Sequence, residues 1–446
     1  MAGLESTRFL TFDGGFASTN LLQRPDRYRH IEADLGDAGR IARGGGMSYA
    51  AASFGSESIV QQMSAFNRLL AFDAERRTLR VEAGAEIGSL STWAAGRGLL
   101  MPVLPGYPTI TVGGCIAADV HGKNPLRDGT FRDWVTAMTL YHPRHGLRSL
   151  EPVRDAELFE ATCGGYGLTG LIVDATLRLV EQRGAAYAVE ATPVGSLQQA
   201  TEAITLRGES HEFAYSWHDG TLRGAAFGRG IVFAGSWTGE PPPQQGQDGE
   251  ARRYRPMTAE SRGKWPVSLW NRSTGRLGNA YFRRQALGRP VAVKSLSDAA
   301  FPFARQTLYH RMFGRRGFAE MQVLVPDRSW SVFIERLGAA VARIDPPLMM
   351  MSIKRLRGGS RSLGLSGEGS LIALDLIRGS TTSRFLEAID EVVVETGAQP
   401  NPAKDSRLPQ AVASAALPHY QSFRERLRQW DGDRLYRSEL SRRLQL

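Results

Sequence analysis

A glycine-rich stretch in the first third of the chain combines residue types that suit a large anionic ligand. Residues 104–124 read LPGYPTITVGGCIAADVHGKN. Gly106, Gly113 and Gly114 lack a Cβ atom and can adopt positive φ, so their N–H groups can turn toward a phosphate or a flat ring. An imidazole, a cation and an amide end the stretch, after small residues that can pack beneath a ligand. This pattern predicts a bed for a cofactor.

A second glycine cluster, RGGGMSY at residues 43–49, follows the short run RIA. Three consecutive glycines expose a row of amides that can bind a pyrophosphate as a nest does, and Ser48 adds a hydroxyl donor. A flexible surface loop has the same composition. Taken alone, this cluster therefore leaves both interpretations open.

The segment GYGLTG at residues 165–170 matches the dinucleotide fingerprint G-x-G-x-x-G. That fingerprint requires a strand before it and a helix after it, with the helix N-terminus facing the pyrophosphate. Here a helix-like run at residues 155–161 comes first, and the strand pattern LIVDATLRLV at residues 171–180 follows. The order is reversed, so we do not interpret the segment as a Rossmann site.

The bulk composition sets the size and the class of the molecule. With 446 residues and 42% hydrophobic side chains, the chain is long enough for two hydrophobic cores, and two domains are expected. The two cysteines, Cys115 and Cys163, do not form a disulfide framework, and we expect buried reduced thiols in a reducing compartment.

The charge balance points to an anionic partner. The net charge is +10 and the isoelectric point is near 9.8. No basic run is interleaved with stacking aromatic residues, so nucleic acid is not expected as a partner, and no metal site is expected. Because the chain shows neither a run of about 18 apolar residues nor a secretory signal, we expect a cytoplasmic protein.

The elements that must position these residues form an α+β pattern. Residues 8–190 alternate short β-rich runs with glycine turns and a few helical patches, including a helix at residues 87–98. A second block begins near residue 187 and combines strand patterns with helical ones. The strands are expected at residues 213–217, 230–237, 319–325, 348–356 and 371–377, and the helices at residues 330–344 and 383–396. Residues 238–256, rich in Pro, Gln and Gly, predict a mobile loop.

Several motifs together, in this order and spacing, resemble the FAD-linked oxidases of the vanillyl-alcohol oxidase superfamily with a PCMH-type FAD-binding domain. The similarity is strongest to the decaprenylphosphoryl-ribose 2'-oxidase family. The motifs are IARGGGMSY at 41–49, MPVLPG at 101–106, TVGGCIAADVHGKN at 111–124, DAELFEATCGGYGLTGLI at 155–172 and AKDSR at 403–407.

The resemblance implies an α+β fold with three parts. Residues 1–186 are expected to form an FAD-binding domain of two subdomains. Residues 187–400 are expected to form a substrate domain whose antiparallel sheet covers the flavin. Residues 401–446 are expected to return to the FAD-binding domain.

The resemblance also implies the residues that bind FAD. Gly167, Thr169 and Gly170 are expected on the far side of the cofactor, and Ile172 near its adenine end. The remaining expected contacts are Arg43, Gly44, Gly45, Gly46, Met47, Ser48, Tyr49, Pro105, Gly106, Thr111, Val112, Gly113, Gly114, Ala117, Ala118, His121, Gly122 and Asn124.

Three positions depart from the pattern of the wider superfamily. Many members attach FAD covalently through a histidine where this chain has Met47, and some add a cysteine link where it has Tyr107. Neither side chain can form that bond, so FAD is expected to be held non-covalently. Some relatives place a small residue where this chain has the bulkier Val120, which predicts slow use of O2.

The catalytic and substrate residues also follow from the resemblance. Lys404 matches the active-site lysine of the family and is expected either to remove a proton or to hold an oxyanion or a phosphate as a cation. His121 is the second catalytic candidate, as a proton acceptor. Gln322, Lys354 and Phe282 are expected to contact substrate, whereas Glu320 stands where relatives have an amide.

The activity implied is FAD-dependent oxidation of a secondary sugar hydroxyl to a keto-sugar. The expected substrate is a prenyl-phosphate-linked ribofuranose, which is oxidised at C2'. This oxidation is the first half of an epimerisation to arabinose, and a separate NADH-dependent short-chain reductase completes it. The alternatives are a soluble alditol or aldonolactone oxidase, and a protein that only binds nucleic acid or membranes.

The basic tail of the chain suggests a peripheral contact with the inner face of the plasma membrane through acidic headgroups, although a solvated amphipathic helix explains the same pattern. The tail arginines are Arg424, Arg426, Arg428, Arg434, Arg437, Arg442 and Arg443.

Overall fold

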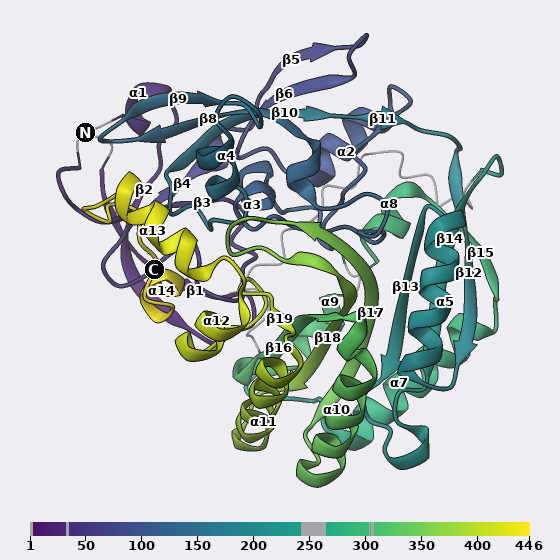
Figure 1. Ribbon diagram of the computed structural model, residues 1–446. Coiled ribbons are helices and arrows are strands. Elements are labelled where there is room, and N and C mark those ends of the chain that lie inside the picture. The colour runs from purple at the N-terminus through teal and green to yellow at the C-terminus, as the bar shows by residue number, and fades with distance from the viewer. Residues whose placement is uncertain (1–2, 33–34, 242–264, 303, 305–306) are drawn as a thin grey trace.

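The structure is a computed structural model that describes residues 3–32, 35–241, 265–302, 304 and 307–446. Two regions lie against one another (Figure 1). One is built from the first 180 residues and holds three small sheets, and the other is organised around a single sheet of eight strands. The α+β class predicted from the sequence is confirmed.

The first region contains a mixed sheet and an antiparallel sheet. The mixed sheet has the order β1 (Glu5–Leu10), β2 (Ala17–Gln23), β4 (Ile59–Gln62) and β3 (Arg40–Arg43), and β4 runs parallel to both β2 and β3. The antiparallel sheet has the order β5 (Leu69–Asp73), β6 (Thr78–Glu82), β10 (Leu171–Arg178), β8 (Val135–His142) and β9 (Gly146–Leu150). A two-stranded sheet pairs β7 (Leu99–Leu100) with β11 (Val180–Glu181).

Four helices belong to this region, namely α1 (Tyr28–Ile31), α2 (Ile87–Ala95), α3 (Val112–Ala117) and α4 (Ala156–Thr162). Because α4 precedes the segment GYGLTG and strand β10 follows it, the rejection of a Rossmann site is confirmed. Cys115 and Cys163 are buried and free, as expected.

Helix α3 corrects one expectation. None of Gly106, Gly113 and Gly114 has positive φ, and the last two lie inside the helix. Close packing is the physical reason for glycine at Gly113, since a Cβ atom there would lie 3.1 Å from the Cβ of Ala83. Thr111 caps the helix by accepting a hydrogen bond from the N–H of Gly114. The glycine pair therefore lies in a short helix packed against Ala83, just after β6, and not in a left-handed loop.

The second region is an antiparallel sheet whose strands are not consecutive in space. The order is β15 (Val291–Lys294), β12 (Ala186–Val194), β14 (Gly230–Thr238), β13 (Phe213–Asp219), β17 (Leu348–Gly359), β18 (Ser366–Ile377), β16 (Phe318–Pro326) and β19 (Gln399–Pro400). The expected strands of the second block are present, and each is longer than its sequence pattern indicated.

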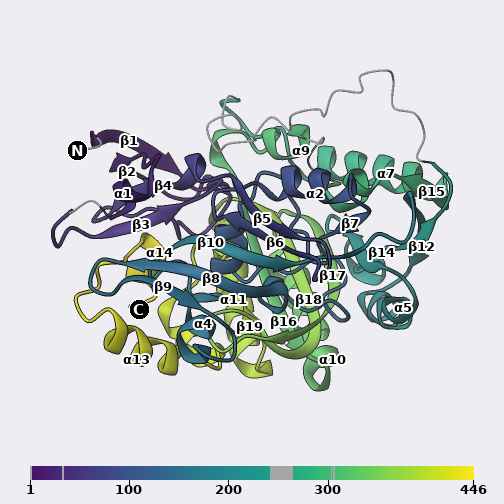
Figure 2. The ribbon, with the colours of Figure 1, turned by 90° about the horizontal axis from the view of Figure 1, so that it is seen from above.

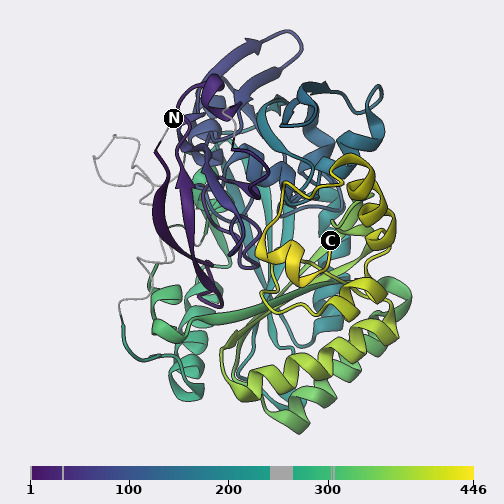
Figure 3. The same cartoon turned by 90° about the vertical axis from the view of Figure 1, so that its left-hand side faces the viewer.

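Helices cover the two faces of this sheet differently. The outer face packs into the largest core against α5 (Leu197–Ser210), α10 (Trp330–Ile344) and α11 (Ser380–Thr396). On the inner face, α7 (Arg272–Leu287) covers the aromatic side chains of β12, β13 and β14. Figures 2 and 3 show α7 on the opposite side of the sheet from α5 and α10. The short helices α8 (Leu296–Ala300) and α9 (Thr307–Arg311) follow α7.

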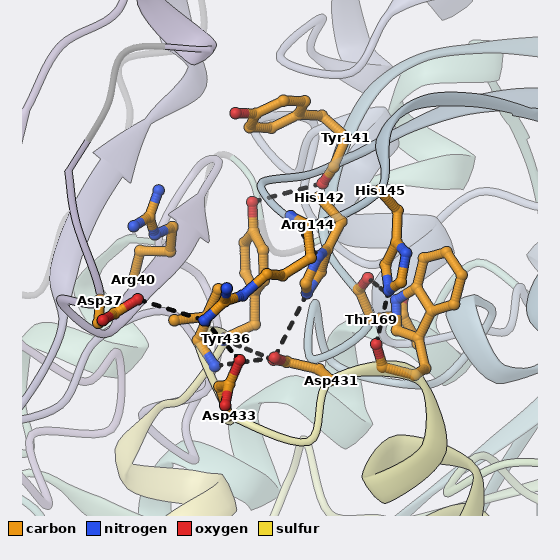
Figure 4. Close-up of polar contacts among 12 residues, drawn as sticks. Asp37, Arg40, Tyr141, His142, Arg144, His145, Thr169, Asp431, Asp433 and Tyr436 are labelled. Atoms are coloured by element: carbon orange, nitrogen blue, oxygen red, sulfur yellow. Dashed lines mark hydrogen bonds and ion pairs between the residues drawn. The ribbon is translucent and has the colours of Figure 1, made fainter.

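The last residues lie against the first region. Helices α12 (Gln410–Ala416), α13 (Tyr420–Trp430) and α14 (Glu439–Arg443) pack in one core with side chains of β1, β2 and β3. Figure 4 shows a second contact of the tail, in which Asp431 lies 3.4 Å from buried His142 at the end of β8. Trp430 stacks on His145 in the turn after β8. The exact boundaries of the three domains remain a prediction.

Two further expectations concern loops and membranes. Of the loop predicted at residues 238–256, residues 242–256 lie outside the described residues. No helix in the part of the chain that the structure describes is long and apolar enough to cross a membrane.

Candidate functional site

A large cavity lies between the first region and the inner face of the eight-stranded sheet. Its empty volume is about 1910 Å³ when the open mouth is included. One wall is formed by the loop at residues 44–49 and by α3, and the opposite wall by β16, β17 and β18. Residues 401–404, which follow β19, close one end.

The loop at residues 44–49 presents backbone amides to this cavity. Gly46 has φ +66°, a conformation that a residue with a Cβ rarely adopts. A Cβ atom on Gly45 would lie 2.2 Å from the carbonyl oxygen of Thr109, so the loop is pressed against its neighbour. The N–H groups of residues 45–48 donate no hydrogen bond to another described residue. These donors are available to a pyrophosphate, and the residues present therefore fit FAD.

The opposite wall follows from the alternation of side chains along antiparallel strands. Glu320 and Gln322 on β16 point to the same face because they are two residues apart. The register pairs Gln322 with Ala373 and Glu320 with Asp375 on β18. Met350, Ser352 and Lys354 continue the same face on β17. The sheet thus gathers one amide, two carboxyl groups and one ammonium group over the cavity.

Lys404 reaches the cavity from the segment after β19. Its Nζ lies 3.2 Å from Oε1 of Glu320 and 3.3 Å from the hydroxyl of Tyr49, and it also lies over the Tyr49 ring. Burial, and then the charge of Glu320, raise the pKa of Asp375 well above its ordinary value. Tyr309 donates a hydrogen bond of 3.1 Å to Asp375. The neutral form of Asp375 is therefore favoured beside Glu320, which forms the ion pair with Lys404.

His121 is held in its neutral form. Burial, and then the charge of Lys354, lower the pKa of His121 to about 3. Its Nδ1 lies 3.0 Å from the carbonyl oxygen of Gly122, and its Nε2 lies 3.3 Å from Oε1 of Gln322. Asn401 donates to the same oxygen of Gln322 at 2.7 Å. A histidine with so low a pKa is a weak base, so the geometry favours an orienting role for His121.

Lysines are concentrated at this site. The chain has 55 basic residues, of which five are lysines, and four of these are Lys404, Lys354, Lys123 and Lys294. Lys354 lines the cavity. Lys123 donates to the carbonyl oxygen of Ala299 and lies 5.5 Å from the ring of Tyr215, and Lys294 lies 5.9 Å from the ring of Phe233.

Lys123, Lys294 and Lys354 form no ion pair with a described residue, in contrast to Lys404. Burial, and then repulsion by Lys354 and Lys294, lower the pKa of Lys123 well below its ordinary value. Burial, and then Lys404, lower the pKa of Lys354 to about 8, against the opposing charge of Glu320. Burial lowers the pKa of Lys294, against the opposing charge of Asp298. The chemistry of this cluster suits an anion.

The structure brings most of the predicted residues together around the cavity. Their binding and catalytic roles remain predictions. The predicted residues that line the cavity are Gly44, Gly45, Gly46, Met47, Ser48, Tyr49, Pro105, Gly106, Thr111, Gly113, Gly114, Ala117, Ala118, His121, Gly167, Gly170, Ile172, Gln322, Lys354 and Lys404.

Three of the predicted cofactor residues lie next to the cavity without lining it. The guanidinium of Arg43 lies beneath the glycine loop, where it donates to Ser53 and stacks on Phe9. Val112 is fully buried in the core under α3, and Gly122 packs against the backbone at Val103.

Three other predicted residues, two for the cofactor and one for the substrate, make their contacts away from the cavity. The amide of Asn124 donates to the carbonyl oxygen of Gly208 at 3.1 Å, so it fixes the end of α5 and does not face the cavity. The hydroxyl of Thr169 bonds to Thr162, and its carbonyl oxygen accepts from Trp430. Phe282, predicted to contact substrate, packs its ring 4.7 Å from that of Trp217 under α7.

The sequence reasoning missed several cavity residues. Asp375 and Asn401 come from strand and loop positions whose neighbours are apolar or small, and only the register of β18 with β16 shows that Asp375 faces Glu320. Tyr309 and His310 lie on α9, a helix of five residues without a clear periodic pattern. Tyr166, inside the segment GYGLTG, also lines the cavity. Its φ of +53° is unusual for a residue with a side chain, but the sequence does not reveal it.

Comparisons with known proteins agree with this geometry. A family model described as an FAD binding domain matches residues 38–147. Decaprenylphosphoryl-beta-D-ribose oxidase of Mycolicibacterium smegmatis is 30% identical over 423 residues, which cover 93% of this chain and 91% of that protein. An uncharacterized protein of Streptomyces coelicolor is 27% identical over 368 residues, 78% of this chain and 96% of that protein.

A more distant relative matches a shorter part. L-gulonolactone oxidase of Bos taurus is 28% identical over 127 residues, 28% of this chain and 29% of that protein. The long match to the mycobacterial oxidase, together with the FAD-binding domain and the cavity, settles the family. The chain belongs to the decaprenylphosphoryl-ribose oxidase family of FAD-linked oxidases and is an FAD-dependent oxidoreductase that acts on CH–OH groups of sugars.

Proposed function

We propose that this protein oxidises the C2' hydroxyl of a ribofuranose linked to a prenyl phosphate, as the first half of an epimerisation to arabinose. The observation that carries the proposal is the cluster of Lys123, Lys294 and Lys354. Lys354 lines the cavity, Lys123 lies over the ring of Tyr215, and Lys294 lies over the ring of Phe233. A relative that matches almost the whole chain is named as the oxidase of a phosphoryl sugar, and this name supports the same substrate class.

The lysine cluster favours a substrate with an anionic group. Three half-buried ammonium groups that form no ion pair with a described residue lie close enough for Lys354 and Lys294 to repel Lys123, and a phosphate placed between them relieves that repulsion. A neutral alditol or lactone leaves the repulsion in place. The cluster therefore selects a phosphorylated sugar over the neutral substrates of the alternative function.

The half-buried ring of Tyr215 beside Lys123 favours an apolar chain on the same substrate, whereas Phe233 and Trp217 are 6% and 7% exposed and lie under α7. Tyr215 and Phe233 are paired across β13 and β14, with ring centroids 5.4 Å apart, and Trp217 lies on the same face. Lys123 and Lys294 stand over these rings. A prenyl phosphate has this order of groups, an anion followed by a hydrocarbon chain.

The residues of the cavity divide the work in the following way. The amides of residues 45–48 hold the pyrophosphate of FAD. When bound, FAD supplies the flavin ring that accepts a hydride. Lys404 holds the substrate oxygen, and its ion pair with Glu320 takes up the hydroxyl proton, while neutral His121 orients Gln322. Met47 and Tyr107 line the cavity and supply neither an imidazole nor a thiol for a covalent link, so FAD is held non-covalently. A separate NADH-dependent short-chain reductase completes the epimerisation.

The test is anaerobic reduction of the bound FAD, followed by its absorbance. Farnesylphosphoryl ribofuranose is expected to bleach the flavin, and xylitol or L-gulonolactone at the same concentration is not. Lys294→Met is expected to raise the concentration needed for half-maximal reduction about tenfold, because one charge-assisted contact to phosphate is lost. Rapid reduction by a neutral sugar and none by the phosphorylated one would overturn the proposal.

A further inference from the structure

The positive charge of this protein is concentrated in one segment of the substrate domain. Residues 265–317 contain nine arginines and one lysine but a single acid, Asp298, so that this segment alone carries a formal charge of +9. The whole chain carries +10. Among the described basic residues of this segment, only Arg272 forms an ion pair with another described residue, Asp345. The rest of the segment is therefore not neutralised within the described part of the chain.

Apolar side chains are exposed on the same segment. Leu277 and Tyr281 lie one helical turn apart on the solvent side of α7 and are 72% and 66% exposed. Arg276 and Arg284 are exposed beside them on the same helix. Further exposed apolar residues are Val267, Leu269, Val291 and Leu308.

Few side chains on the inner side of α7 attach this helix to the sheet. Phe282 and Asn279 hold the helix to the sheet, Phe282 through Trp217 and Asn279 through a hydrogen bond of 2.7 Å to Asp219. Gly275 is the only residue of α7 that is fully buried. The helix is thus anchored by a narrow stripe, and it leaves both apolar and basic side chains in solvent.

We propose that the surface formed by α7, β15 and α9 docks onto an anionic lipid membrane. A surface that combines scattered arginines with isolated apolar side chains matches the interface of such a membrane, where each basic residue contributes about 1 kcal/mol and the apolar side chains insert between headgroups. A second copy of this chain would bring two strongly positive surfaces together, so the charge favours a lipid surface over self-association.

The position of the surface adds a functional consequence. Helix α9 also supplies Tyr309 and His310 to the wall of the cavity, so the docking surface and the cavity share an element. Figures 2 and 3 show α7 and α9 on the same side of the molecule. Docking there brings the cavity close to the lipid. This inference goes beyond the proposed reaction, and its test uses no substrate.

The C-terminal tail is less suited to this role than its sequence suggested. Its arginines are largely occupied, since Arg442 pairs with Glu439, Arg437 lies 4.0 Å from Glu57 and Arg426 donates to the carbonyl oxygen of Arg361. The helices of the tail pack against the first region. The contact with acidic headgroups is therefore assigned to the α7 surface.

Vesicle co-sedimentation of the FAD-loaded protein tests the proposal. Vesicles of phosphatidylglycerol and phosphatidylcholine in equal amounts are expected to bind the protein, and pure phosphatidylcholine at least tenfold more weakly. Leu277→Glu and Arg284→Glu are each expected to weaken binding to the anionic vesicles about tenfold or more. Thermal melting and FAD content show whether each variant is folded.

Two matched control variants lie on the outer face of the sheet. Leu206 on α5 is 73% exposed, almost the same as Leu277, and Arg343 on α10 is exposed as well. Leu206→Glu and Arg343→Glu are expected to leave vesicle binding unchanged. Equal effects of the test and control variants would overturn the proposal, and so would equal binding to both kinds of vesicle. A doubled mass in solution that Leu277→Glu abolishes, without vesicle binding, would assign the surface to a second copy instead.

Discussion

The ammonium of Lys404 lies 3.2 Å from Oε1 of Glu320, and Glu320 is paired across the sheet with Asp375. The carboxylate offsets the charge of the lysine that is closest to the substrate oxygen in our proposal. The cavity is therefore less positive than its lysines alone would make it.

Glu320→Gln is expected to strengthen the binding of a phosphorylated substrate. The change removes one negative charge from the cavity wall and leaves Lys404 without its ion-pair partner, which at effective dielectric constants near 20 is an electrostatic effect of a few kcal/mol before screening. Because Lys404 is partly exposed, we expect a three- to tenfold lower apparent Kd for farnesyl phosphate. Isothermal titration measures it. Glu320→Asp keeps the charge and should resemble the wild type, and weaker binding by the Gln variant would contradict the prediction.

The affinity for phosphate should fall as the pH rises through about 8. Burial, and then the charge of Lys404, lower the pKa of Lys354 to about 8, so this ammonium group is present below that pH and lost above it. An anion binds the charged form, so binding weakens with rising pH. Titrations of farnesyl phosphate between pH 6.5 and 9.5 check the sign. Lys354→Met should bind more weakly and with a flatter pH profile, whereas a wild-type profile that rises with pH would exclude Lys354 as a ligand.

The sequence predicted the repetitive parts of this structure well. The helix at Trp330–Ile344 was expected with the same bounds, because its apolar residues recur at helical spacing and it lies on a sheet. The resemblance placed the glycine clusters at residues 44–46 and 113–114 on one cofactor, and both clusters line the same cavity. The helix was predicted from a local pattern, whereas the place of the glycine clusters was predicted from the resemblance.

The failures came from packing between distant segments. Asn124 follows the glycine stretch directly, yet its amide is satisfied by carbonyl oxygens at the end of α5, more than 80 residues away in the chain. Gly113 is glycine because of Ala83, which no local pattern reveals. Helix α7, with a single buried residue, lacks the wide apolar stripe by which a helix is recognised in a sequence.

FAD is expected to leave this protein when it unfolds. Met47 and Tyr107 line the cavity, and neither side chain supplies the imidazole or the thiol of a histidyl or cysteinyl link. Precipitation with trichloroacetic acid should therefore release essentially all of the flavin into the supernatant, where its absorbance near 450 nm measures it. A yellow pellet that retains the flavin through solvent washing would disprove non-covalent binding. Met47→His tests whether the loop can support a link once a nucleophile is present.

Oxygen is expected to reoxidise the reduced flavin slowly, and Val120 is the side chain expected to limit it. Val120 lines the cavity just after α3 and packs at the edge of the core of the first region. Val120→Gly removes three carbon atoms from that wall and should speed reoxidation by O2 tenfold or more. Stopped-flow mixing of the reduced protein with aerated buffer measures the rate. Val120→Ile keeps the bulk and should remain slow, and equal rates in all three proteins would remove Val120 from the oxygen path.

The tail that returns to the first region should depend on one buried carboxylate. Burial alone would raise the pKa of Asp431, but hydrogen bonds from His142 and from the amides of Tyr436 and Leu435 outweigh it and hold this pKa below its ordinary value (Figure 4). A depressed pKa means that the carboxylate stabilises the fold above the pKa of the unfolded chain, and that this stability is lost as the pH falls through the folded pKa.

Asp431→Asn is therefore expected to lower the free energy of unfolding by about 1–3 kcal/mol at pH 7, since a buried and hydrogen-bonded charge is removed. The difference from the wild type should shrink as the pH falls from the ordinary aspartate pKa through the lower pKa of folded Asp431, because the wild-type carboxyl is then itself protonated. Urea unfolding at pH 7 and at a pH below this folded pKa measures both values. Asp433 pairs with Arg144 at 2.6 Å but is largely exposed, so Asp433→Asn is the matched control and should cost less than about 1 kcal/mol. If both variants lost the same stability at both pH values, the tail would be held by its apolar contacts alone.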